Sequence, residues 1–84
     1  MLIPEDLDPR AYRQVHGLSQ EALAKRLAVS FYSVAVWERR RRAGRSAVEL
    51  LRKRLPEITG ELAAERLAEG RAELAAQLSQ AAGE

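Results

Sequence analysis

The spacing of apolar residues predicts helices along the whole chain. Leu23, Ala24 and Leu27 fall on one side of a helix, and Val34 and Trp37 fall three residues apart in the next segment. The period-two alternation of a half-buried strand does not occur over any useful length. The sequence therefore predicts an all-α fold of four short helices followed by a longer tail helix.

Residues that favour helix ends give the limits of the first three helices. Asp8 precedes Pro9, an N-cap residue followed by proline at the first helical position, and this helix ends near Gly17. Ser19 and Ser30 are the N-cap residues of the second and third helices. Three helices of two to three turns each are therefore expected before the arginine-rich segment.

The fourth helix begins at the capping box Ser46–Glu49 and is expected to stop at Pro56, because proline breaks a helix interior. Thr59-Gly60 then starts the tail helix. Its modest apolar stripe consists of Leu62, Leu67, Leu74 and Leu78. We expect two parts: a domain over 1–56 and an acidic, Ala/Leu-rich helix over 57–84. The tail leucines can complete the core, form a dimer interface or bind another protein.

Charge divides the chain at the same place. Residues 1–56 hold twelve Lys and Arg against six Asp and Glu, a net charge of +6, and residues 57–84 have a net charge of −4. A basic body suggests a polyanion as partner, although an acidic tail can also neutralise its own protein. There is no cysteine, and no apolar run approaches the ~20 residues of a membrane span. We expect a cytoplasmic protein with no membrane partner.

Three residues, Ala28-Val29-Ser30, separate the second helix from the third. So short a turn forces the two helices to cross steeply, which is the outline of a helix-turn-helix whose second helix can enter a DNA major groove. The segments Gly17–Ala24 and Val29–Glu38 resemble the lambda-repressor/Cro-like (Xre) helix-turn-helix family, and the resemblance covers roughly residues 8 to 55. It implies that residues 1–56 are a DNA-binding domain, a compact bundle of four to five helices that binds double-stranded operator DNA, often as a homodimer. We therefore expect a small, nucleoid-associated dimeric repressor. The resemblance also implies a structural ion pair between Arg13 and Glu38.

The same resemblance assigns DNA contacts residue by residue. The positions expected to touch phosphates or base edges are Gln20, Ser30 and Ser33, and those expected to face the bases are Phe31, Tyr32, Ala35 and Val36. Apolar side chains dominate the second group, so direct readout would rest on thymine methyl groups and on the Tyr32 hydroxyl.

Two substitutions depart from the family pattern. Ala28 replaces the usual turn glycine, which demands a backbone without strain at that position. Arg39-Arg40 replaces the usual Asn-Gly pair, so the third helix is expected to run a turn longer, to Gly44. The arginine run Arg39, Arg40, Arg41 and Arg42 carries enough mutual repulsion to favour an anion beside it. We expect these arginines to clamp DNA phosphates.

Catalysis is not expected. His16 is the only histidine, and no carboxylate pattern has the spacing of a metal site or an acid–base pair. We therefore expect no enzyme activity, no cofactor and no metal. The alternative to DNA binding is a protein-interaction module or antitoxin-type binder that uses the exposed face of the third helix or the C-terminal helix.

Overall fold

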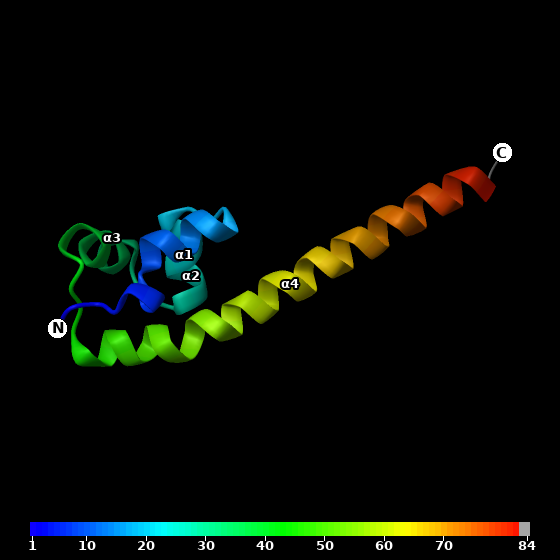
Figure 1. Ribbon diagram of the computed structural model, residues 1–84. Helices are drawn as coiled ribbons and strands as arrows, with labels where there is room; N and C mark the ends of the chain where they lie inside the picture. Colours follow the sequence, from blue (N-terminus) through cyan, green and yellow to red (C-terminus); the bar gives the residue numbers. More distant parts are fainter. Residues whose placement is uncertain (83–84) are drawn as a thin grey trace.

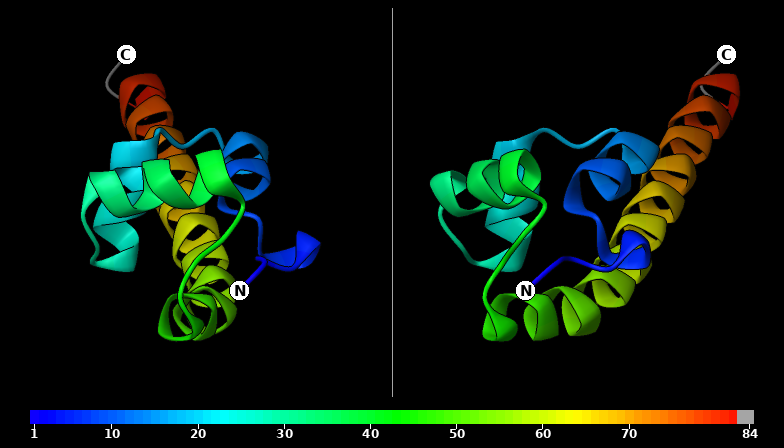
Figure 2. Two further views of the ribbon diagram at one scale, coloured as in Figure 1. Left: turned by 90° about the vertical axis from the view of Figure 1, so that its left-hand side faces the viewer. Right: turned by 60° about the vertical axis from the view of Figure 1, so that its left-hand side comes forward.

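A computed structural model describes residues 1–82 of the chain, and it is helical throughout that range apart from short connections (Figure 1). The elements are η1 (Glu5–Leu7, a 3-10 turn), α1 (Pro9–His16), α2 (Gln20–Leu27), α3 (Phe31–Arg40) and α4 (Arg45–Ala82). The all-α prediction is confirmed. Two views show α1, α2 and α3 gathered against the N-terminal half of α4 (Figure 2).

The predicted N-caps are present. The side chains of Asp8, Ser19 and Ser30 accept hydrogen bonds from the backbone N–H groups of Arg10, Ala22 and Ser33, at 3.0, 3.0 and 3.1 Å. Each bond satisfies a donor that the first helical turn leaves without an intrahelical partner. These local signals therefore fix where α1, α2 and α3 begin.

The expected helix end at Pro56 is wrong, because α4 is one helix with Pro56 inside it. Its inward residues recur at alternating intervals of three and four and continue past the proline: Val48, Leu51, Leu55, Ile58 and Leu62. Pro56 itself is exposed. Water can therefore bond the Arg52 carbonyl, which loses its helical partner. The start also differs, since α4 begins at Arg45 and Ser46 lies inside its first turn.

α4 bends near Pro56, and the bend follows the body (Figure 1). The Thr59 hydroxyl donates to the Leu55 carbonyl at 3.0 Å, a side-chain bond that bends helices, as proline does. From α1, the Tyr12 hydroxyl also donates to the Leu55 carbonyl at 3.0 Å, and it lies 2.8 Å from Thr59 Oγ1. The bend and the α1–α4 contact are thus made by the same few atoms.

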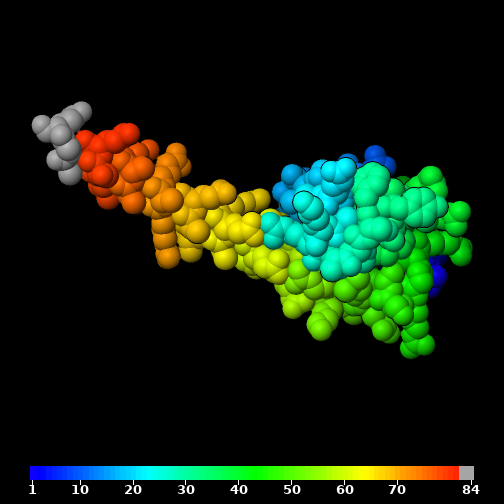
Figure 3. Space-filling view, turned by 180° about the vertical axis from the view of Figure 1, so that it is seen from behind, coloured from blue at the N-terminus to red at the C-terminus, as the bar shows by residue number. Residues whose placement is uncertain are grey.

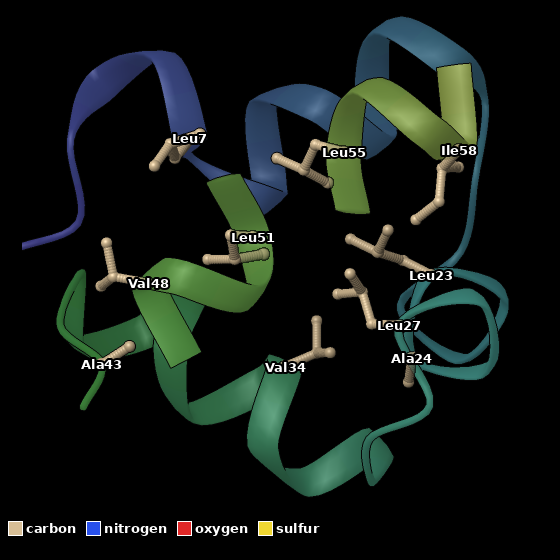
Figure 4. Close-up of a cluster of buried hydrophobic side chains, with 10 residues drawn as sticks. All are labelled: Leu7, Leu23, Ala24, Leu27, Val34, Ala43, Val48, Leu51, Leu55 and Ile58. Atoms are coloured by element: carbon tan, nitrogen blue, oxygen red, sulfur yellow. The ribbon is translucent and has the colours of Figure 1, made fainter. Parts of the chain in front are cut away.

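The core lies between α4 and the other helices (Figure 4). Its buried side chains are Leu7, Leu23, Ala24, Leu27, Val34, Ala43, Val48, Leu51, Leu55 and Ile58. Val29 and Trp37 pack against it while partly exposed. The predicted apolar faces of α2 and α3 are therefore buried, and η1 and the α3–α4 linker add Leu7 and Ala43.

The α3–α4 linker pairs with the N-terminal segment. The Ile3 N–H donates to the Arg41 carbonyl and the Ala43 N–H to the Met1 carbonyl, both at 3.1 Å, and Leu2 forms an antiparallel bridge with Arg42. The expected extension of α3 to Gly44 is wrong. The helix ends at Arg40, because Arg41 adopts a left-handed conformation at φ 55° and the linker turns to meet Leu2.

Beyond Leu62, α4 extends away from the body (Figures 1 and 3). Leu67, Leu74 and Leu78 are 58, 56 and 61% exposed. The reading in which these leucines complete the core is therefore wrong. The described chain is 61 Å long but only 19 Å wide in the other two directions.

The turn between α2 and α3 is strained, contrary to the expectation from sequence. Ala28 has φ 58° and ψ 41°, a left-handed conformation that costs a residue with a Cβ atom about 1–2 kcal/mol. The strain is tolerated because the Ala28 N–H donates to the Lys25 carbonyl and the Val29 N–H to the Ala24 carbonyl, which closes the end of α2.

Replacing Ala28 with glycine should stabilise the fold. Glycine removes the Cβ strain at positive φ but adds freedom to the unfolded chain, so we expect the free energy of unfolding to rise by about 0.5–1 kcal/mol. Urea denaturation followed by circular dichroism measures this change. The control is Ala11→Gly, in helix α1, which should lower stability by ~1 kcal/mol. A loss of stability in Ala28→Gly would contradict the strain.

Candidate nucleic-acid interface

The outward face of α3 carries most of the residues that the sequence assigned to DNA bases. Tyr32, Val36 and Arg39 follow one another at intervals of four and three, so they share one side of the helix. Phe31 and Tyr32 are 50 and 72% exposed. Val34 occupies the opposite side and is fully buried. The apolar character predicted for this face is therefore a property of the surface and is not explained by core packing.

Ser30 and Ser33 lie together at the start of α3. Their hydroxyl oxygens are 2.9 Å apart, and Ser30 Oγ also accepts from the Ser33 N–H. Only one of the two hydroxyl hydrogens is needed for the contact between them. The other hydroxyl can still donate to an external acceptor such as a phosphate oxygen.

An ion pair between Arg13 and Glu38 joins α1 to α3. Arg13 donates two hydrogen bonds to the Glu38 carboxylate, at 2.9 and 2.8 Å, and the Glu38 side chain is only 5% exposed. The pair implied by the family resemblance is thus present in bidentate form, the geometry that makes such pairs strong. Gln20, expected at a phosphate, donates instead to Glu38 at 3.2 Å, so its side chain links α2 to the same carboxylate.

The environment of Glu38 lowers its pKa. Burial by itself raises the pKa, because it disfavours the charged form, but hydrogen bonds from Arg13 and Gln20 and the charge of Arg13 outweigh it. Glu38 therefore stays ionised and balances one of the arginines around it.

A basic hollow lies where α1, α2 and α3 meet. Its lining residues are Arg10, Arg13, Gln20, Ala35, Glu38 and Arg39. Three arginines against one glutamate leave it positive, and the first turn of α2 adds backbone N–H groups without helical partners. Sequence reasoning missed Arg10. Its place three residues before Arg13 on the same helix was the available signal.

The arginine run does not form one patch. Arg39 lines the basic hollow, Arg40 and Arg42 line a second hollow beside Val36 and Trp37, and Arg41 lines a third. The third hollow also contains Glu5 and Asp8, so the surroundings of Arg41 are partly acidic. The side chains expected to act together are therefore spread around the end of α3.

A separate group of charges fixes the point where α4 leaves the body. Arg26, at the end of α2, donates to Glu65 at 2.9 and 2.7 Å and to Glu61 at 3.4 Å. Arg54 donates to Glu61 at 2.9 Å and to the Arg26 carbonyl at 2.8 Å. These contacts involve Glu61 and Glu65 of the acidic tail, and they were not predicted from the sequence.

Residues 1–82 hold neither a metal site nor a membrane-spanning helix. No three His, Asp or Glu side chains gather there in a way that could hold a metal ion. In the same range, no helix is both long enough and apolar enough to cross a bilayer. No family model, curated protein or solved structure matches the chain.

Acid should weaken the fold through Glu38. Its pKa in the folded state lies below the ordinary value of 4.5, so its contribution to stability is full above that value and is lost as the pH falls through the lowered pKa. Glu38→Gln should cost about 2 kcal/mol at pH 7, because Arg13 then lacks its countercharge.

Urea unfolding of both proteins from pH 7 to pH 3 measures the effect. The variant should lose less stability than the wild type on acidification, so their stabilities should converge. A constant difference down to pH 3 would show that the Glu38 charge contributes nothing.

Proposed function

We propose that this chain is a sequence-specific DNA-binding regulator, most simply a small dimeric repressor, whose α3 enters the major groove. The observation that carries the proposal is the common surface of α2 and α3. The basic hollow joins Gln20, at the start of α2, to Ala35 and Arg39 on the outward side of α3. The N-terminal end of α2 and the outward side of α3 thus border one hollow, which supports a role for α3 in reading bases and for the end of α2 in binding phosphate across a groove.

Affinity would come from the arginines at the two edges of this face. Arg10 and Arg39 line one side of α3, and Arg40 and Arg42 line another. Each phosphate contact releases counterions, so binding should weaken as salt rises, with a slope of about −0.9 per contact in a double-logarithmic plot.

Specificity would come from Phe31, Tyr32 and Val36. The exposed Phe31 ring and the half-buried Val36 can contact thymine methyl groups, and the hydroxyl of the exposed Tyr32 can bond a base edge. The lambda-repressor-like resemblance and the short turn between α2 and α3 support this assignment of roles. The exposed aromatic pair also suits the alternative, an interaction module that binds a protein groove.

Arg39→Ala should weaken binding to every duplex to a similar extent. We expect about a tenfold loss, or ~1.4 kcal/mol, together with a salt slope smaller by about one. Fluorescence anisotropy measures both, with DNA from upstream of the gene beside a scrambled duplex. The matched control is Arg52→Ala, which removes the same charge from the exposed side of α4 and should change affinity little.

Val36→Arg tests reading of the bases, and it should change the preferred sequence in a selection from random duplexes. Unchanged preference, or an equal loss of affinity for Arg39→Ala and Arg52→Ala, would contradict the proposal. The protein-interaction alternative predicts that Phe31→Ala abolishes capture of a protein partner while the arginine variants behave as wild type.

A further inference from the structure

The free part of α4 carries an apolar face directed away from its own body. Leu62 is the last residue packed against the core. The same side of the helix then carries Glu65, Glu69 and Glu73, at intervals of three and four residues. The leucines lie roughly on the opposite side. Their line comprises Ala64, Leu67, Arg71, Leu74, Leu78 and Ala81, which we call the leucine seam.

The leucine seam has the spacing of a two-helix interface. Its residues follow at intervals of three, four, three, four and three, which keeps one line in contact with a partner helix. Ala68, Gly70 and Ala75 flank it, and such small residues let two helix axes approach closely. All of the seam lies on exposed helix beyond the body, with Leu67, Leu74 and Leu78 more than half exposed (Figure 3).

We infer that the partner of the seam is the same helix of a second copy, running antiparallel. The order of residue sizes along the seam is the same in both directions. In an antiparallel pair of helices, Ala64 therefore lies opposite Ala81, Leu67 opposite Leu78, and Arg71 opposite Leu74. Each of these three pairs occurs twice in the dimer. Every large residue then meets a large one and every alanine meets an alanine. The register uses the whole free helix, because it starts just beyond Leu62 and ends at Ala81.

Charge selects the antiparallel direction. A parallel pair would set the two Arg71 guanidinium groups against each other. It would also place side by side two bodies of net charge +4, counted over residues 1–62. The antiparallel pair puts Arg71 beside the Leu74 side chain, along which its methylene groups can pack. It also separates the two Leu62 residues by about 30 Å, at 1.5 Å per residue, which is several Debye lengths at physiological salt.

This inference goes beyond the proposed function and rests on it only in that a dimer presents two copies of α3. Sedimentation equilibrium on the full chain should give a dimer. Leu67→Glu should raise the dimer dissociation constant at least about a hundredfold, because each dimer buries Leu67 twice, each time against an apolar Leu78. Ala76→Glu is the matched control. It adds the same charge outside the seam and should leave the dissociation constant unchanged.

Crosslinking tests the direction, since the chain has no cysteine of its own. Leu67→Cys and Leu78→Cys proteins should join to each other through a short thiol crosslinker when mixed, and neither should join efficiently to itself. Self-crosslinking of Leu67→Cys would overturn the antiparallel register, and a monomer at all concentrations would overturn the dimer. DNA affinity of the Leu67→Glu monomer for a single half-site reports the proposed function separately.

Discussion

The continuous apolar face of α4 is the constraint on which the fold depends. Val48, Leu51, Leu55 and Ile58 all point into one core, and each is at most 4% exposed. η1, α1, α2 and α3 each bring only a short helical segment to this core. Each of these segments is shorter than about 12 residues, and isolated helices of that length are marginal in water. One long helix therefore supplies the surface against which four short segments become ordered.

This face also explains why the sequence predicted α4 incorrectly. Proline is a local signal and its cost in a helix interior is about 3 kcal/mol, so a boundary at Pro56 follows from local rules. Ile58 and Leu62 extend the three-four spacing across the proline, and burying them offsets that cost. The caps at Asp8, Ser19 and Ser30 were predictable, because a cap depends only on its neighbours in sequence.

The sequence predicted most of the residues of the candidate site, but it did not predict how their side chains are arranged. The outward position of Phe31, Tyr32 and Val36 follows from helical periodicity. Periodicity does not predict that the side chains of Arg39 to Arg42 line separate hollows. That arrangement depends on the left-handed conformation of Arg41 and on the pairing of Leu2 with Arg42 in the α3–α4 linker. Those features come from contacts between segments about 40 residues apart. Arg10 joins the site for a similar reason, through the packing of α1 beside α2 and α3.

The second half of α4 receives little support from its own body. The Arg26–Glu65 ion pair holds its beginning, and Gly70 weakens its middle. If a second copy supplies the missing support, the order of this segment becomes a function of protein concentration. With the DNA binding proposed above, scarce protein would have a frayed tail and present one α3, and abundant protein would have an ordered pair of tail helices and present two. DNA binding would then depend on the concentration of the protein itself.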